Sequence, residues 1–325
     1  MNKSTLSEPS QTLVIAAFAA IYVVWGSTYL AIRVAVETLP PFLSAGVRFL
    51  VAGGLLYAFL RIRGLARPSP MQWRRAAVAG VLLLVGGNGL VMWAEQRISS
   101  GFTALLVALA PVWFALIDWM RPGGIRPQSR TIIGIVIGFF GVVVLVNGHG
   151  SVVRGHEHWW GALAVIIAGI CWAGGSLYSK HNPTTASPWM NAATQMTCGG
   201  AALLVGGVLL GEPFRTEWQR ISGRSLTALA YLIVFGSWIG FSAYLWVLKT
   251  STASRVSTYA YVNPVIAVFL GWALLGESVN TRVLWGALII FAGVVTITIP
   301  RAALAQAWIR ARRYAMCFLP GSRAG

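Results

Sequence analysis

Long apolar stretches alternate with short polar connectors along almost the whole chain. Each stretch is about 17 to 23 residues long, the length that an α-helix needs to cross the hydrocarbon core of a bilayer. Backbone polar groups cannot be left unsatisfied in lipid, so the stretches are predicted to be helices. They fall at residues 12–32, 42–60, 76–94, 101–120, 131–148, 160–179, 189–210, 226–248, 255–275 and 283–300. The pattern predicts an all-α integral membrane protein with ten transmembrane helices.

The chain contains an internal duplication, because residues 22–148 reappear in altered form at residues 169–300. At an offset of 147, the matches include Trp25 with Trp172, Arg33 with Lys180 and Pro41 with Pro188. At offsets of 153 and 152, they include Trp93 with Trp246, Pro111 with Pro264, Gly134 with Gly286 and Gly141 with Gly293. The offset changes only in polar connectors, where insertions are tolerated. We expect a first five-helix repeat over 12–148, a second over 160–300 and a basic cytoplasmic tail over 301–325.

Five crossings per repeat is an odd number, so the second repeat is predicted to enter the membrane from the opposite side. The two repeats would then have inverted topology. This plan is typical of secondary transporters, in which the substrate binds near the bilayer midplane between two halves that move against each other.

Composition agrees with a membrane protein and excludes a soluble globule. Hydrophobic residues make up 57% of the chain, charged residues only 10%, and the mean hydropathy is +0.70. The formal charge of +17 could indicate nucleic-acid binding, but the arginines lie in short connectors, so no nucleic-acid partner is expected. Cys171 and Cys198 lie in apolar stretches and Cys317 in the tail. Their spacing predicts no disulfide framework, and we expect no metal site and no cofactor.

Basic residues in the connectors predict the orientation. With a cytoplasmic N-terminus, seventeen Lys and Arg residues lie inside and seven outside. The second repeat without the tail gives three inside and four outside, so this orientation depends on the first repeat and the tail. The first stretch follows a lysine, as a signal peptide would, but no small-residue cleavage site follows it. We expect a multi-pass protein of the bacterial inner membrane with both termini cytoplasmic.

Two prolines lie near the centres of predicted helices, at equivalent positions of the repeats. Pro111 and Pro264 each remove a backbone hydrogen bond and free a carbonyl four residues earlier. A packing kink is the ordinary explanation. Paired kinks at matched depth also indicate a central substrate site.

Aromatic residues and small polar residues cluster near Pro264 and in the first helix of each repeat. They are Tyr259, Tyr261 and Asn263 near Pro264, Trp25, Ser27, Thr28 and Tyr29 in the first helix, and Trp172, Ser176 and Tyr178 in its repeat equivalent. Such rings suit organic solutes, which stack on their faces and hydrogen-bond at their edges. Tryptophan and tyrosine also form belts at the membrane interface, so this alternative stays open.

Ionisable and amide side chains inside the apolar stretches are further candidates. Arg48, whose repeat equivalent is Gln195, could bind a substrate carboxylate or form a structural bridge to freed carbonyls. Asn88 is a candidate substrate contact. Glu95 or Asp118 could carry a coupling proton if desolvation brings a carboxyl pKa toward neutrality, or they could simply pair with Arg97 and Arg121. Glu277 is interpreted as a polar helix terminus.

Glycines in the fifth, eighth and tenth stretches indicate close helix packing. Gly134, Gly138 and Gly141 form one face, which Gly286 and Gly293 repeat, and Gly236 and Gly240 are four residues apart. The first pattern is equally compatible with a homodimer.

Several short motifs together resemble the EamA-domain transporters of the drug/metabolite transporter superfamily. They are Trp-Gly-Ser-Thr-Tyr at 25–29, Val-Arg-Phe at 47–49, Glu-Gln at 95–96, Ala-Pro-Val at 110–112, Asn-Pro-Val at 263–265 and Leu-Gly-Glu at 275–277. The resemblance covers about residues 12–300. It implies an inner-membrane exporter of metabolites, amino acids or drugs, driven by the proton gradient or by exchange.

Two other classes of membrane protein are alternatives to a transporter. A membrane enzyme would need clustered ligands or a nucleophile with a base, and His149, His156 and His158 in one outer loop make a poor catalytic site. A channel, or a membrane scaffold that transports nothing, is the alternative; a channel needs a continuous polar lining. We therefore predict an alternating-access transporter that contacts a small molecule through Trp25, Thr28, Tyr29, Arg48, Asn88, Trp172, Gln195, Tyr259 and Asn263. Glu95 is the predicted coupling carboxyl, and helices one, three, four, six, eight and nine are predicted to line the pocket.

Overall fold

A computed structural model describes residues 10–98, 100–124, 126–147, 156–182, 187–275 and 281–298. Within these ranges the chain is helical and contains no β-strand. The tail 301–325, Glu277 and the side chains of the outer histidine loop lie outside the described residues.

The first half of the chain runs through α1 to α7. These are α1 (Gln11–Ala35), α2 (Pro41–Ile62), α3 (Pro70–Gly80), η1 (Val81–Gly89), α4 (Leu90–Ala94), α5 (Ser100–Val107), α6 (Ala110–Met120) and α7 (Ser129–Asn147). The second half begins with α8 (His156–His181), α9 (Pro188–Leu209), α10 (Glu212–Arg215), η2 (Trp218–Arg220) and α11 (Gly223–Tyr231). It ends with η3 (Leu232–Phe241), α12 (Ser242–Thr250), α13 (Ala253–Val256), α14 (Tyr259–Leu275) and α15 (Thr281–Thr298).

Helix starts follow local sequence signals. Ser69 accepts a hydrogen bond from the backbone of Gln72, and the Gln72 side chain accepts one from the backbone of Ser69, which completes a capping box before Pro70. Ser187 caps α9 in the same position before Pro188. Each proline occupies the first helical position, where no backbone donor is needed.

Six segments are long and apolar enough to cross a bilayer. They are Gln11–Ala35, Pro41–Ile62, Pro70–Ala94, Trp159–His181, Pro188–Leu209 and Gly223–Thr250. Shorter apolar helices overlap three further predicted stretches. They are Leu105–Met120 for 101–120, Ser129–Val144 for 131–148 and Leu284–Thr298 for 283–300. The stretch at 255–275 is divided into α13 and α14. Ten crossings therefore stay a prediction, while the all-helical membrane class is established.

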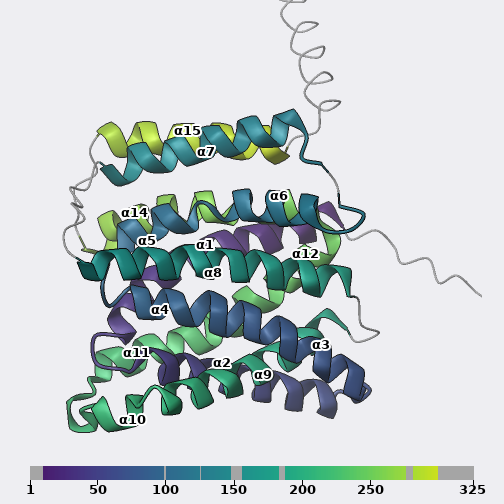
Figure 1. The fold of residues 1–325 in the computed structure, drawn as a ribbon, viewed down its shortest axis with the longest axis vertical. Coiled ribbons are helices and arrows are strands. Elements are labelled where there is room, and N and C mark those ends of the chain that lie inside the picture. The colour runs from purple at the N-terminus through teal and green to yellow at the C-terminus, as the bar shows by residue number, and fades with distance from the viewer. Residues whose placement is uncertain are drawn as a thin grey trace, which may run out of the picture.

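The most extensive helix contacts join repeat-equivalent helices. In Figure 1, α7 and α15 lie side by side at one edge of the molecule, and α2 and α9 at the opposite edge. Glycines allow both approaches, because a Cβ on Gly200 would lie 2.5 Å from the Leu50 nitrogen and a Cβ on Gly293 would lie 2.6 Å from the Gly138 nitrogen. The glycine face of α7 is thus covered by α15 within one chain.

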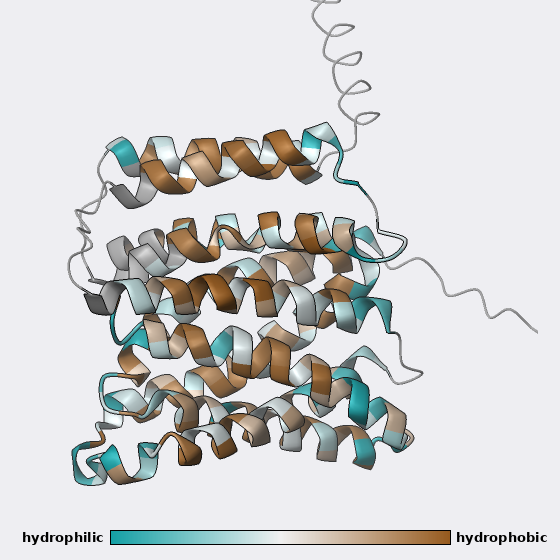
Figure 2. Ribbon diagram, in the orientation of Figure 1, coloured by the Kyte–Doolittle hydropathy of each residue, from teal (hydrophilic) through white to brown (hydrophobic). Residues whose placement is uncertain are grey.

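Hydrophobic residues extend along the helices and hydrophilic residues gather at the two ends of the bundle (Figure 2). Large apolar side chains such as Val136, Phe140 and Leu288 are exposed on the outside. In water these side chains would be a liability, but on a lipid-facing surface they are expected.

Both halves contain a π-helical segment in the same place. The span Val81–Gly89 in η1 corresponds, at an offset of 153, to residues 234–242, which overlap η3 at Leu232–Phe241. A π-helix accommodates extra residues per turn and is often found at functional sites. The apolar pattern of the sequence did not predict either segment.

Candidate functional site

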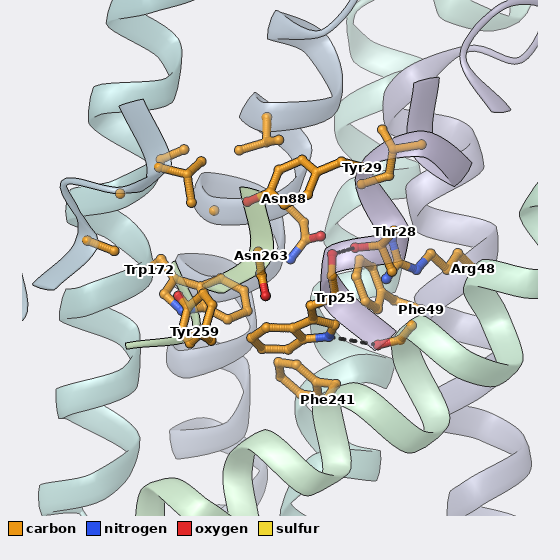
Figure 3. A pocket seen from close by; sticks show the side chains of 18 residues that line it. Trp25, Thr28, Tyr29, Arg48, Phe49, Asn88, Trp172, Phe241, Tyr259 and Asn263 are labelled. Carbon is orange, nitrogen blue, oxygen red and sulfur yellow. Dashed lines mark hydrogen bonds between the residues drawn. The ribbon is translucent and has the colours of Figure 1, made fainter. Parts of the chain in front are cut away.

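A cavity of about 100 Å³ lies between the two halves of the chain. The first half contributes Trp25, Thr28, Tyr29, Ile32, Arg48, Phe49, Gly87, Asn88, Val91, Val107 and Ala110, and the second contributes Ala168, Gly169, Trp172, Gly236, Phe241, Tyr259 and Asn263. Figure 3 shows these side chains converging from helices distant in sequence. The volume exceeds the roughly 10–15 Å³ that one water requires, so the space suits a small solute.

The structure brings together all the predicted substrate contacts except one. Gln195 does not line the cavity; its Nε2 donates a 2.9 Å hydrogen bond to Ser179 Oγ. Pro111 and Pro264 do not line it either, although their neighbours Ala110 and Asn263 do. Pro111 follows the turn between α5 and α6, whereas Pro264 lies inside α14.

The predicted set of lining helices omitted α2, although Arg48 on that helix was a predicted contact, and Phe49 and Phe241 were not predicted. Phe49 adjoins Arg48 on the same helix. Phe241 is the repeat equivalent of Asn88 at an offset of 153, so the duplication itself carried the signal that would have found it.

Aromatic rings form the floor of the cavity. The ring centroids of Trp25 and Trp172 are 5.5 Å apart, and those of Trp25 and Tyr259 are 5.0 Å apart, both in edge-to-face geometry. Tyr244 packs beneath both tryptophans and shares a 2.5 Å hydrogen bond with Ser176. These rings lie within the bundle and not on its lipid-facing surface, which favours the pocket interpretation over an interfacial belt for these residues.

The two tryptophans make matching contacts across the halves. A Cβ on Gly240 would lie 2.5 Å from Trp25 Nε1, and a Cβ on Gly87 would lie 2.7 Å from Trp172 Cε3. Gly87 and Gly240 are repeat equivalents at an offset of 153. The hydrogen bonding differs, however: Trp25 Nε1 donates to Gly236 O at 3.2 Å, whereas Trp172 Nε1 is buried near the Tyr244 and Tyr259 hydroxyls and makes no hydrogen bond of ordinary geometry.

Among the described residues that line the cavity, Arg48 is the one that carries a charge. Its side chain is 3% exposed, its Nε donates to Ser237 Oγ at 2.7 Å, and its Cζ lies 4.5 Å from the Phe49 ring centroid. Its Nη1 is buried without a hydrogen-bond partner, as is Asn263 Oδ1. Two residues of the cavity wall thus carry buried polar atoms, one donor and one acceptor, that no described residue satisfies.

Glu95 is fully buried, and neither of its carboxylate oxygens has a hydrogen-bond partner among the described residues. The pairing with Arg97 is not formed, because the Arg97 guanidinium lies 3.7 Å above the Trp93 ring and donates to Trp93 O. Asp118, by contrast, accepts a 2.6 Å hydrogen bond from Arg121. Asp118 is therefore paired, whereas Glu95 has no hydrogen-bond partner among the described residues and only the charge of Arg33 acts on its carboxyl.

A basic residue holds the end of the third helix in each half. Arg33 Nη1 donates to Glu95 O at 2.5 Å, and Lys180 Nζ donates to Leu248 O at 2.7 Å. Arg33 and Lys180 are repeat equivalents, and so are Glu95 and Leu248 at an offset of 153. The contact that both halves share is thus made to the backbone carbonyl of Glu95 or Leu248. The Glu95 carboxyl has no counterpart in the second half.

A larger polar cavity of about 520 Å³ lies at one end of the bundle, where the connectors after α1, α4 and α9 meet. Glu212 belongs to its wall, and its two carboxylate oxygens accept hydrogen bonds from the backbone of Phe42 at 3.0 Å and Leu43 at 2.8 Å. A residue of the second half therefore caps the N-terminus of α2.

Comparison with known proteins gives consistent matches over nearly the whole chain. The model of the EamA-like transporter family matches residues 12–147 and 159–299. The uncharacterized inner membrane transporter YedA of Escherichia coli is 40% identical over 286 residues, which cover 87% of this chain and 90% of that protein. The uncharacterized transporter YoaV of Bacillus subtilis is 24% identical over 276 residues, covering 85% and 93%. One crystal structure shares the fold with a TM-score of 0.73 at 20% identity, covering 90% of this chain and 99% of that chain.

Proposed function

Since the chain belongs to the EamA-like transporter family, we propose that it is an inner-membrane secondary transporter that moves a small organic solute by alternating access. Export is the direction that the family resemblance favours. The inner-membrane location follows the description of YedA.

The observation that carries the proposal is the cavity shared by the two halves. Repeat-equivalent residues line it in pairs, namely Trp25 with Trp172, Asn88 with Phe241 and Ala110 with Asn263. In an inverted-repeat transporter, each half can adopt the conformation that the other half holds, so the central site opens to one side of the membrane and then to the other. Alternating access and the ten-helix inverted topology are both part of the proposal.

The unequal tryptophans support this mechanism. Trp25 bonds to Gly236 O, and the repeat equivalent of Gly236 is Leu83. When the halves exchange conformations, Trp172 Nε1 would bond to Leu83 O and Trp25 would release Gly236. The described conformation would then be one of two related by this exchange.

Saturable exchange separates a transporter from a channel or a scaffold. Purified protein in proteoliposomes, loaded with unlabelled solute, should accumulate labelled solute from outside against its gradient. A channel would conduct without counterflow, and a scaffold would move nothing. Absence of saturable counterflow for every solute in a broad panel would refute the proposed function.

We assign proton coupling to Glu95. A carboxyl buried without hydrogen-bond donors is stable when protonated and needs water or a cation when ionised, so opening of the site would release its proton. Glu95→Gln should abolish the dependence of transport on a pH gradient while counterflow persists. Glu37→Gln, at an exposed carboxyl on the polar end cavity, is the matched control and should leave both unchanged. If the Glu95→Gln protein still responds to the pH gradient, the coupling residue lies elsewhere.

A further inference from the structure

The central cavity contains a positive charge that no described residue neutralises. Arg48 is nearly fully buried, its Nη1 has no hydrogen-bond partner, and the ion pairs found in the described part of the chain involve other residues. A buried charge within a bilayer is costly unless it meets an opposite charge. An anion in the cavity would supply what the protein does not.

Gly236 leaves room for the Arg48 guanidinium to pack against η3 beside the cavity. A Cβ on Gly236 would lie 2.8 Å from Arg48 Nη2, so a larger residue in η3 would displace the guanidinium. Ser237, the next residue, fixes Nε and leaves the far end of the fork unbonded. A planar guanidinium held in this way matches a carboxylate better than a spherical ion.

Two other buried atoms on the cavity wall lack partners. Asn263 Oδ1 needs a donor, and Trp172 Nε1 needs an acceptor. In Figure 3, Arg48 enters from one side, Trp172 and Tyr259 stand on the other, and Asn263 lies between them. A ligand with an anionic group and a separate hydrogen-bond donor would complement this wall.

We propose, on the basis of the transporter function above, that the substrate is a small organic carboxylate that carries one hydrogen-bond donor near its acid group. The carboxylate binds Arg48 Nη1, the donor binds Asn263 Oδ1, and the carbon atoms lie against Trp25 and Tyr259. The donor can be the hydroxyl of a hydroxy acid or the ammonium of an amino acid. Organic cations without an acid group are excluded, because Arg48 repels them and none of the described residues that line the cavity is acidic.

The test compares acids with their amides on the full-length purified protein. The ligands are L-lactate, L-alanine and propionate, each beside lactamide, alaninamide or propionamide, at constant ionic strength set with chloride. Ligand binding stabilises the folded protein by RT ln(1 + [L]/Kd), so at equal concentration the tighter ligand raises the unfolding temperature more. We expect the acids to bind at least about tenfold more tightly than the amides, since a charge-assisted hydrogen bond is lost. Lactate or alanine should bind more tightly than propionate. Whichever of the two binds more tightly identifies the donor as hydroxyl or ammonium.

Variants assign the two contacts. Arg48→Gln should remove the preference for acids over amides. Asn263→Ala should remove only the preference for lactate or alanine over propionate. Arg220→Gln, at an exposed arginine that pairs with Glu217 outside the central cavity, should change neither. The wild-type comparison needs no variant, so the test stands even if Arg48→Gln does not fold.

Equal binding of acids and amides, or binding of neutral or cationic solutes only, would overturn the carboxylate assignment. The transporter function is tested separately by counterflow. Saturable counterflow of a neutral solute would leave that function intact while refuting the substrate class. Saturable counterflow of lactate or alanine that Arg48→Gln abolishes, with Arg220→Gln unaffected, supports both.

Discussion

Arg48, Asn88 and Glu95 correspond in the repeat alignment to Gln195, Phe241 and Leu248. Each pair sets a polar or charged side chain of the first half against a less polar one of the second. At another cavity position the order is reversed, since Asn263 of the second half corresponds to Ala110 of the first, whereas Trp25 and Trp172 are the same residue. The polar groups of the cavity therefore differ between two halves that share one fold.

Glu212 should stabilise the chain through the start of α2. Its carboxylate satisfies two backbone donors that the helix itself cannot use and interacts favourably with the helix dipole. Glu212→Gln is expected to lower stability by about 1 kcal/mol. Glu217→Gln is the control, because that carboxyl is exposed and pairs with Arg220 at the surface. Equal thermal unfolding of the two variants in detergent would contradict the capping role.

The tryptophans should respond unequally to removal of their indole nitrogens. Trp25→Phe loses a hydrogen bond of about 1 kcal/mol in the described conformation, whereas Trp172→Phe loses none there. Trp25→Phe should therefore shift the population toward the opposite conformation. Cysteine accessibility on the two sides of the membrane measures this shift. Identical accessibility patterns for both variants would argue against the exchange.

At the scale of elements, the sequence predicted where the helices lie along the chain better than it predicted their internal geometry. The apolar stretches matched helices, and polar residues such as Asn263 and Arg48 stood out because they interrupt them. The π-helices η1 and η3 carry no such mark, because the apolar residues and glycines that make up most of them are equally compatible with an α-helix. Gln195 was inferred from Arg48 by the repeat alone, but its helix turns that side chain toward Ser179 and away from the cavity.

Contact between α2 and α9 should depend on Gly200. A methyl group there would lie 2.5 Å from the backbone nitrogen of Leu50, so the helices would have to separate. Gly200→Ala is expected to cost about 1–3 kcal/mol, as overpacking does. Gly206→Ala, on the same helix but with open space at its Cβ, should cause no loss. The unfolding temperatures of the two proteins provide the measurement, and a neutral Gly200→Ala would show that α9 can shift freely.

At the scale of the whole molecule, inverted topology makes a directional prediction. Arg67 follows α2 and Glu217 follows α10, and both are exposed. In a cysteine-free background, Arg67→Cys should react with a membrane-impermeant thiol reagent only from the cytoplasmic side, and Glu217→Cys only from outside. Labelling of both from one side would rule out two oppositely inserted repeats and the transport mechanism built on them.

Arg33 and Lys180 clamp the corresponding backbone position in each half with nearly the same chemistry. In a protein whose halves trade conformations, such clamps would make the two end states close to degenerate in free energy. A planar guanidinium and a point-charge ammonium differ as donors, and that difference would set the resting bias. An imbalance on the order of 1 kcal/mol is enough for a several-fold preference, so swapping the two side chains should invert the side of the membrane to which the idle protein is open.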